Sequence, residues 1–280
     1  MKKVNWNKLT GMVAILGTSA LLLGACGSDT AEAEDASTAT SISESETPTL
    51  DAIKESGKLT VATGTYVPFE YRDPDTDEII GYDIDFAQIL ADKLNVELEV
   101  TDMQFTSIIP SVVKGDYDLA IAAMYDTPER REQVLMSDSY LETGMVLVTQ
   151  TGQHQDIESL EDAEGLRVGV KTGATSEKIA QEAMAEYGIN YEIIGYDETV
   201  GAILDLEAGR VDVVVNDLLN QLEINKTHDA VEIATEPFTE SNLSIAVQQG
   251  NEDLMDFINE TIKEYKADGT KDELYKKWVE

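Results

Sequence analysis

One order of elements occurs twice in this chain, about a hundred residues apart: a strand, a Gly/Thr-rich loop, a helix, a glycine, an aspartate and a buried strand. The first copy starts with the strand at 58–62 (KLTVA), and the second with the strand at 166–170 (LRVGV). The helices stop at Gly115 and Gly209, where glycine is a favoured C-cap, and an apolar strand follows each aspartate. Strands that alternate with helices form mostly parallel sheets, and ligands of such sheets bind beyond the carboxyl ends of the strands. The pattern predicts two α/β lobes whose loops face one cleft.

The chain is predicted to cross from one lobe to the other twice. We expect residues 49–148 and 240–280 to form lobe 1 and residues 149–239 to form lobe 2, with crossings near 148–152 and 237–241. The final stretch, 254–279, has helical apolar spacing with a break at Asp268-Gly269, and should pack back on lobe 1.

The N-terminus has the features of an export signal. Residues 1–8 carry three lysines and no acid, and residues 9–23 are apolar or small, which predicts a signal peptide at 1–25. Cys26 ends a Leu-Gly-Ala-Cys string similar to a bacterial lipobox, so we expect it to be lipidated; the alternative is a chance small residue within a cleaved signal. Residues 26–48, rich in Ser, Thr, Ala, Glu and Asp, are predicted to be a tether because they cannot bury enough apolar surface to fold.

Composition excludes several classes of protein. A net charge of −35, from 55 acidic and 20 basic residues, argues against a nucleic-acid partner. The single cysteine excludes a disulfide framework and a cysteine-based metal site. His154 and His228 lie in acidic stretches without metal-ligand spacing, so neither a metal nor a cofactor is expected.

Several segments together resemble the periplasmic-type amino-acid-binding proteins of ABC importers, family 3 extracellular solute-binding lipoproteins. They cover nearly all of the chain after the tether, at 64–71 (GTYVPFEY), 79–94, 105–140, 166–179 (LRVGVKTGATSEKI) and 266–278. The resemblance implies a type II periplasmic binding protein fold with mixed, mostly parallel sheets, a hinge and a central cleft. It also implies a monomer, lipid-anchored outside the cell membrane of a Gram-positive bacterium, that captures an amino acid or similar zwitterion and delivers it to an ABC permease.

Two charged residues match the residues that hold the ligand in that family. Arg130 matches the arginine that binds the ligand α-carboxylate, a role suited to a guanidinium because it can donate two parallel hydrogen bonds. The alternative is a surface arginine paired with Glu129 or Glu132, as we expect for Arg131. Asp217, at the end of the second buried strand, matches the acid that binds the α-ammonium.

Asp217 could equally be the N-cap of the segment that follows it, and the two roles can coexist.

Two aromatic residues match the side chains that enclose the ligand in the family. These are Tyr66 and Phe105, which would present their ring faces to the ligand side chain. The alternative for both is a place in the hydrophobic core, which we expect for Phe69.

The loop at Gly173-Ala174-Thr175 opens a predicted helix, so its N–H groups are suited to a carboxylate oxygen. Gly173 and Thr175 are therefore candidate ligand contacts. The alternative is an ordinary helix N-cap supplied by Thr172 or Thr175.

Three positions depart from the family pattern. Where relatives commonly read AGMT or AGIT, this chain reads Ala122-Ala123-Met124-Tyr125, so Ala123 and Tyr125 are expected to form the pocket floor. Thr63 stands where many relatives carry an acidic residue that binds a polar or cationic side chain of the ligand. The aromatic residue at 125 also resembles the branch that binds ectoine-like compatible solutes, which is the leading alternative ligand class.

Two further functions remain as alternatives. Some relatives on this fold are dehydratases, for which Glu70, Glu142 and Asp217 are the acid or base candidates, although none has a histidine nearby. An extracellular sensor or adhesin would use the same lobes without a permease. We expect a binding protein and not an enzyme.

Overall fold

The computed structural model describes residues 47–280. The predicted signal peptide, the predicted lipidation at Cys26 and nearly all of the predicted tether lie outside the described residues. Helix α1 (Pro48–Ser56) begins at the last residue assigned to that tether, with proline in the first turn, where its missing N–H costs nothing. Within residues 47–280, no helix is long and apolar enough to cross a lipid bilayer.

The first lobe is built on a five-stranded sheet in the order β4-β1-β5-β14-β6. Its strands are β1 (Lys58–Thr63), β4 (Glu97–Asp102), β5 (Leu119–Ala120), β6 (Val134–Met136) and β14 (Ala246–Gln248). A short hairpin of β2 (Tyr71–Arg72) and β3 (Ile79–Ile80) follows β1. The helices of this lobe, besides α1, are α2 (Tyr82–Leu94), α3 (Phe105–Lys114), α4 (Pro128–Arg131), α8 (Glu252–Ala267) and α9 (Thr270–Trp278).

The second lobe repeats this arrangement with the order β10-β9-β11-β8-β12. Its strands are β8 (Met145–Gln150), β9 (Arg167–Lys171), β10 (Glu192–Tyr196), β11 (Val213–Asp217) and β12 (Val231–Ile233). Its helices are α5 (Thr175–Tyr187), α6 (Thr199–Glu207), α7 (Leu218–Ile224) and the short 3₁₀ helix Leu160–Ala163.

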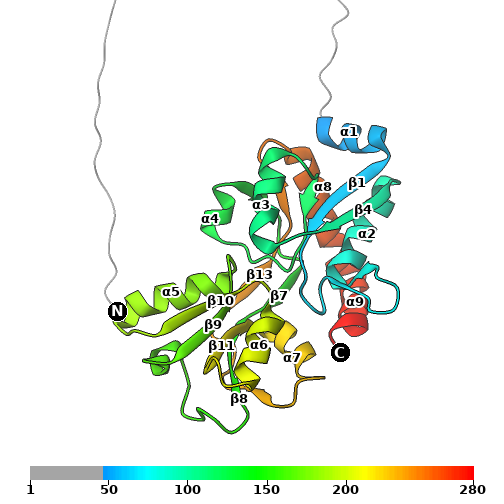
Figure 1. Ribbon diagram of the computed structural model, residues 1–280. Coiled ribbons are helices and arrows are strands. Elements are labelled where there is room, and N and C mark those ends of the chain that lie inside the picture. The colour runs from blue at the N-terminus through cyan, green and yellow to red at the C-terminus, as the bar shows by residue number, and fades with distance from the viewer. Residues whose placement is uncertain (1–46) are drawn as a thin grey trace, which may run out of the picture. The chain divides into compact units, whose positions relative to one another are not determined.

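Each sheet is mixed in the same way. β1 runs parallel to β4 and β5, and β9 runs parallel to β10 and β11. β14 and β8 pair antiparallel with both of their neighbours, so they are the reversed strands of the two sheets. The two sheets form separate layers within the described part of the chain (Figure 1). The predicted two-lobe α/β fold with mixed, mostly parallel sheets is confirmed.

The repeated aspartate has the same structural role in both lobes. The Asp118 carboxylate accepts a hydrogen bond from the backbone N–H of Thr60 at 2.7 Å, and the Asp212 carboxylate accepts one from the backbone N–H of Arg167 at 2.8 Å. Each aspartate thus fixes the start of one buried strand against the start of its neighbour. The Gly–Asp pattern that revealed the repeat is therefore a feature of sheet assembly and not of ligand binding.

The chain enters the second lobe earlier than predicted. β8 lies wholly in the second sheet, so the crossing falls before Met145 and not near 148–152. A buried strand has the same apolar sequence pattern in either sheet, so hydrophobicity alone could not show to which sheet β8 belongs. β7 (Leu141–Thr143) and β13 (Ser241–Leu243) pair where the chain leaves and returns, and they lie side by side between the lobes (Figure 1). At Gly144 a Cβ atom would lie 2.3 Å from the Thr239 carbonyl oxygen, so this close approach requires glycine.

The C-terminal helices return to the first lobe, as predicted. α8 packs against α1 and β6, and α9 packs against α2. The helices are separated by Asp268 and Gly269, whose φ of 94° favours glycine. The indole N–H of Trp278 donates to Asp85 in α2 at 2.7 Å, which fixes the last helix to the lobe.

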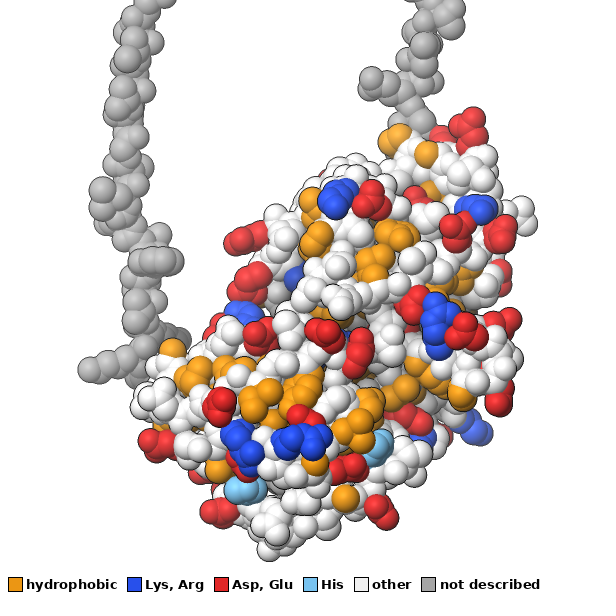
Figure 2. All heavy atoms as spheres, in the orientation of Figure 1, with side chains coloured by type: hydrophobic (Ala, Val, Ile, Leu, Met, Phe, Trp, Pro, Cys, Tyr) orange, Lys and Arg blue, Asp and Glu red, His pale blue; other side chains and the backbone are white. Residues whose placement is uncertain are grey.

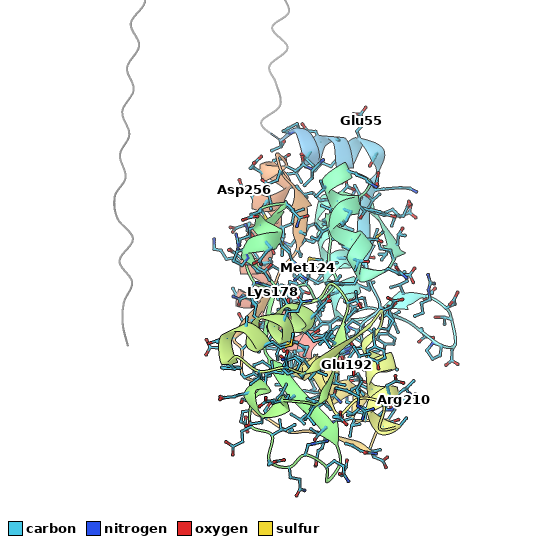
Figure 3. The ribbon with its side chains drawn as sticks, turned by 60° about the vertical axis from the view of Figure 1, so that its left-hand side comes forward. Glu55, Met124, Lys178, Glu192, Arg210 and Asp256 are labelled. Carbon is cyan, nitrogen blue, oxygen red and sulfur yellow. The ribbon has the colours of Figure 1, made fainter. Side chains whose placement is uncertain are left out.

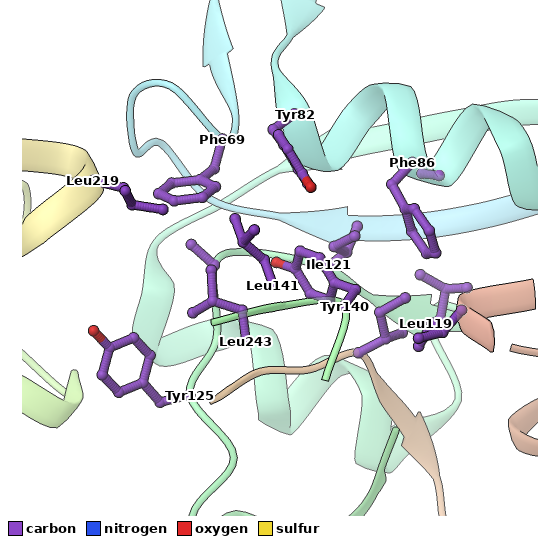
Figure 4. Packing of buried hydrophobic residues seen from close by; sticks show 14 of the residues in the cluster. Phe69, Tyr82, Phe86, Leu119, Ile121, Tyr125, Tyr140, Leu141, Leu219 and Leu243 are labelled. Carbon is purple, nitrogen blue, oxygen red and sulfur yellow. The ribbon is translucent and has the colours of Figure 1, made fainter. Parts of the chain in front are cut away.

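The core of the first lobe is rich in aromatic side chains (Figure 4). The ring of Phe86 stacks on that of Tyr140 with centroids 5.7 Å apart, and Phe69 meets Tyr82 edge-on at 6.3 Å. Phe69 is fully buried, so the core role expected for it is confirmed.

Acidic side chains are scattered over the face seen in Figure 2 without forming one continuous patch. Figure 3 labels four charged residues, of which Glu55 and Asp256 lie in the first lobe and Glu192 and Arg210 in the second. The excess negative charge is thus spread over the surface, where it favours solubility.

Candidate ligand-binding site

A cavity lies between the two lobes, and its empty space, including the part that is open to solvent, is about 400 Å³. The carboxyl ends of β9 and β11 border it from the second lobe, and the loops that follow β1 and β5 border it from the first, as expected for α/β sheets. The lining consists of Tyr66, Phe105, Ala122, Ala123, Tyr125, Arg130, Met145, Lys171, Ala174, Thr175, Ser176 and Asp217.

Most of the residues predicted to contact a ligand line this cavity. They are Tyr66, Phe105, Ala123, Tyr125, Arg130, Thr175 and Asp217. Two others lie elsewhere. Thr63 is fully buried beneath the cavity, and its hydroxyl donates to the Ile121 carbonyl oxygen at 2.7 Å, which explains why it does not face the ligand space. Gly173 borders a neighbouring hollow, and its N–H donates to a Glu177 carboxylate oxygen at 2.7 Å.

Arg130 carries a partly buried positive charge that has no carboxylate partner among residues 47–280. It lies in α4, where Nη1 donates to the Tyr125 carbonyl oxygen at 2.6 Å, and its Cζ lies 5.4 Å from the centroid of the Phe105 ring. No carboxylate of residues 47–280 lies within ion-pair distance, and burial lowers the pKa of the guanidinium to about 10. The neighbouring Arg131 is exposed and pairs with Asp126 at 2.5 Å. Arg130 is thus suited to receive an anion.

Asp217 is the buried negative charge of the lining. Its Oδ1 accepts from the backbone N–H groups of Leu219 and Asn220 at 2.8 and 3.1 Å, so it is the N-cap of α7, as the alternative interpretation held. Its Oδ2 accepts from the hydroxyls of Tyr125 at 2.5 Å and Thr143 at 2.8 Å. Burial raises the pKa of Asp217, and these hydrogen bonds partly offset that rise.

Tyr125 and Ala123 form the wall of the cavity that belongs to the first lobe. The Tyr125 hydroxyl bonds to Asp217 of the second lobe, so this side chain bridges the cavity; in Figure 4 its ring lies apart from the Phe86–Tyr140 stack. Ala123 has a φ of 44°, in the region that favours glycine, and its N–H donates to the buried Asp83 at 2.7 Å. The glycine of the related motif therefore matches the backbone conformation required here, and alanine adopts it at a cost.

Helix α5 begins at Thr175, and its N-cap is Ala174, which makes no side-chain cap bond. The alternative interpretation, in which Thr172 or Thr175 supplies the cap, is therefore wrong. Instead the side chain of Glu177, in the first turn of α5, accepts a hydrogen bond from the N–H of Gly173, just before the helix. N–H groups in the first turn of a helix lack intrahelical acceptors, and Thr175 brings this end of α5 to the cavity.

Tyr66 and Phe105 face the cavity from the first lobe, and Lys171 reaches them from the second. The Tyr66 hydroxyl donates to Asn216 Oδ1 at 2.7 Å, which joins the lobes. The Lys171 Nζ atom lies 4.7 Å from the centroid of the Tyr66 ring and 5.1 Å from that of Phe105. Sequence reasoning missed Lys171, although its place at the end of β9 is equivalent to that of Asp217 at the end of β11.

A pair of buried acids lies beside the cavity in the first lobe. Glu70 is fully buried, and neither of its carboxylate oxygens accepts a hydrogen bond from the described residues. Burial, and next the charge of Asp83, raise the pKa of Glu70 well above its usual value. Burial also raises the pKa of Asp83 to about 6, although Ala123 and Tyr140 donate to its carboxylate. The folded lobe therefore holds protons that the unfolded chain releases near pH 4.

Glu70→Gln is expected to raise the free energy of unfolding at pH 7.5 by about 2 kcal/mol, since it removes a carboxyl group that is buried without a hydrogen-bond partner and whose charged form burial disfavours. Because the folded pKa values are raised, wild-type stability should fall as the pH rises from about 4 through 6, and the variant should show a weaker fall. Urea unfolding at pH 5 and 7.5 measures both effects. The exposed Glu55→Gln is the matched control, and equal pH dependence in both variants would contradict the assignment.

No group of three or more His, Cys, Asp or Glu side chains among residues 47–280 is arranged to hold a metal ion. The cavity itself offers one guanidinium, one ammonium and one carboxylate, with three aromatic rings and the start of a helix. Such a lining binds a small molecule that carries both charges.

Two α/β lobes that enclose a charged cavity and are joined by paired crossing strands define the architecture of a solute-binding protein. Residues 59–280 match the family described as bacterial extracellular solute-binding proteins, family 3. The chain belongs to this family.

Named relatives are similar over most of the chain. The ABC transporter glutamine-binding protein GlnH of Bacillus subtilis (strain 168) is 33% identical over an alignment of 288 residues, which covers 100% of this chain and 98% of GlnH. The ABC transporter arginine-binding protein 1 of Escherichia coli (strain K12) is 33% identical over 221 residues, 77% of this chain and 88% of that protein. The solved structure of an ancestral arginine-binding protein bound to arginine is 38% identical, with a TM-score of 0.75 over 80% of this chain and 99% of the other.

Proposed function

We propose that this protein captures a free amino acid between its lobes and delivers it to the permease of an ABC importer. Arg130 binds the α-carboxylate of the ligand and Asp217 binds its α-ammonium. The observation that carries this proposal is the pair of opposite charges that different lobes contribute to one cavity, the buried carboxylate of Asp217 and the partly buried guanidinium of Arg130, which has no carboxylate partner among the described residues. A zwitterion that contacts both charges compensates the cost of burying each.

The names of the relatives support an amino acid as the ligand, although they differ in which one. One is named for glutamine and another for arginine. Their shared α-carboxylate and α-ammonium groups are the part of the ligand that Arg130 and Asp217 would hold.

Closure of the two lobes is the signal that the permease would recognise. Besides the bonds of Tyr66 and Tyr125, the Asn220 side chain donates to the Val67 carbonyl oxygen at 2.5 Å, and Lys178 of α5 pairs with Glu129 of α4 at 3.0 Å. Figure 3 shows Lys178 on the part of α5 that faces the first lobe. A ligand that contacts both lobes favours this closed arrangement over an open one. The paired strands β7 and β13 are suited to act as the hinge.

The protein would work as a monomer, held to the outer face of the cell membrane by a lipid on Cys26. The signal-like residues 1–25 and the lipobox-like string support this location, which would suit a Gram-positive bacterium. The family description places its members outside the cell.

The proposal assigns no catalytic step. Of the acid or base candidates for a dehydratase, Glu142 lies outside the cavity lining and pairs with Lys266 and Lys271 at 3.1 and 2.9 Å. Glu70 is buried behind the lining, and Asp217 caps a helix. The relatives reported above are named for binding and not for a reaction.

A thermal-shift screen of the purified protein against the common amino acids, cystine and ectoine tests the proposal. A ligand that binds only the folded state raises the melting temperature, by an amount that corresponds to about 2.7 kcal/mol at a concentration of 100 times Kd. We expect a strong shift with at least one α-amino acid. A folded protein that responds to none of them, or to ectoine alone, would contradict the proposal.

A further inference from the structure

The aromatic pair of the cavity already holds a cation that belongs to the protein. The Lys171 side chain is only 7% exposed and ends between the two lobes, within 5.1 Å of the ring centroids of both Tyr66 and Phe105. A cation this close to a ring face is attracted by the negative charge of the π system. The site that two aromatic rings would otherwise offer to a cationic ligand side chain is therefore filled.

The remaining contacts of Lys171 leave its ammonium able to bind another acceptor. Nζ donates to the Thr65 carbonyl oxygen at 3.2 Å and forms a longer ion pair, at 3.7 Å, with a carboxylate oxygen of the half-exposed Glu198. An ammonium has three N–H donors, so these contacts do not saturate it.

The charges of the lining are also unbalanced. Arg130 and Lys171 are cations, and Asp217 is the carboxylate among the lining residues. If Arg130 and Asp217 hold the two α-groups, as the proposed function states, Lys171 is the charged group left to meet the ligand side chain. A second cation placed there would lose hydration and meet a like charge at short range.

We infer that Lys171 determines specificity: the site takes an amino acid whose side chain ends in a carbonyl or carboxylate oxygen, such as glutamine or glutamate, and rejects arginine and lysine. This inference rests on the proposed function and narrows it. The side-chain oxygen accepts a charge-assisted hydrogen bond from Nζ, while the aromatic rings enclose the methylene groups.

Isothermal titration of the wild-type protein and Lys171→Met with glutamine, glutamate, arginine and lysine tests the inference. The wild-type protein should bind glutamine or glutamate at least about tenfold more tightly than arginine or lysine. In Lys171→Met the affinity for glutamine and glutamate should fall about tenfold, and that for arginine should rise because the rings become available. Lys171→Arg keeps the cation and should still reject arginine. Lys226→Met, which removes an exposed positive charge from the same lobe, is the matched control and should leave all affinities unchanged.

The outcomes separate this inference from the proposed function. Wild-type protein that binds arginine or lysine as tightly as glutamine and glutamate overturns the inference and leaves the proposed function intact. An unchanged ratio of affinities in a folded Lys171→Met variant also overturns it. Folded wild-type protein that binds no amino acid refutes the proposed function instead. The wild-type comparison needs no variant, so the inference can be refuted even if Lys171→Met does not fold.

Discussion

Arg130→Met is expected to weaken amino-acid binding by at least about 100-fold while the protein remains folded. Removing one partner of a buried, hydrogen-bonded charge pair costs about 2–5 kcal/mol of binding free energy, and the ligand carboxylate would have no other guanidinium in the cavity lining to replace Arg130. Titration calorimetry with the best ligand of the thermal-shift screen measures the loss.

The same substitution should raise the stability of the ligand-free protein. Burial lowers the pKa of the Arg130 guanidinium to about 10, which means that the folded state holds this charge at a cost. Methionine fills much of the same space without the charge, so the free energy of unfolding should rise by about 1 kcal/mol. If Arg130 only stabilised the fold, its substitution would lower the free energy of unfolding.

Arg131→Met provides the control for both measurements. Its guanidinium is exposed and pairs with Asp126, and exposed pairs contribute about 0–1 kcal/mol. It should change neither the affinity nor the stability appreciably. An Arg130→Met protein that binds its ligand within threefold of the wild-type affinity would refute the assigned role.

The two-lobe fold could be predicted because the same order of sequence features occurs twice along the chain. Each helix that stops at a glycine and is followed by an aspartate and an apolar strand is a local pattern, and the second copy made the two-lobe interpretation independent of any one element. The lobe crossing at Met145 could not be predicted in the same way, because the choice of sheet for β8 depends on pairing with β11, far along the chain.

The cavity was predicted best where a charged residue falls in a motif that the family shares. Asp217 and Arg130 stand at the ends of elements that open toward the cleft, and the resemblance to a family named their roles. Lys171 has the same kind of position, but a lysine at the end of a strand is usually solvated, and only the approach of Tyr66 and Phe105 from the other lobe buries it. Thr63 was predicted to contact the ligand but does not line the cavity. A polar residue at a strand end can instead donate a hydrogen bond to a neighbouring segment of the backbone, as Thr63 does to Ile121.

Asp217→Asn separates the two roles of Asp217, because asparagine is as good an N-cap as aspartate but carries no charge. Oδ1 of the new side chain can still accept from the N–H groups of Leu219 and Asn220, so the free energy of unfolding should change by less than about 1 kcal/mol. The ligand ammonium would instead lie in the cavity without its carboxylate, and we expect Kd to rise by about 30-fold or more. Titration calorimetry and urea unfolding on the same protein sample measure the two effects.

Asp217→Ala removes the cap as well, so its stability should fall below that of Asp217→Asn by about 1 kcal/mol, because the N–H groups of Leu219 and Asn220 lose their side-chain acceptor. Ser159→Ala is the matched control, because Ser159 caps the short helix Leu160–Ala163 in the same lobe, outside the cavity lining. It should lose stability to a similar degree and keep its affinity. If Asp217→Asn keeps wild-type affinity while Asp217→Ala loses it, the carboxylate charge is not needed for binding, and Asp217 serves the site only by holding α7 in place.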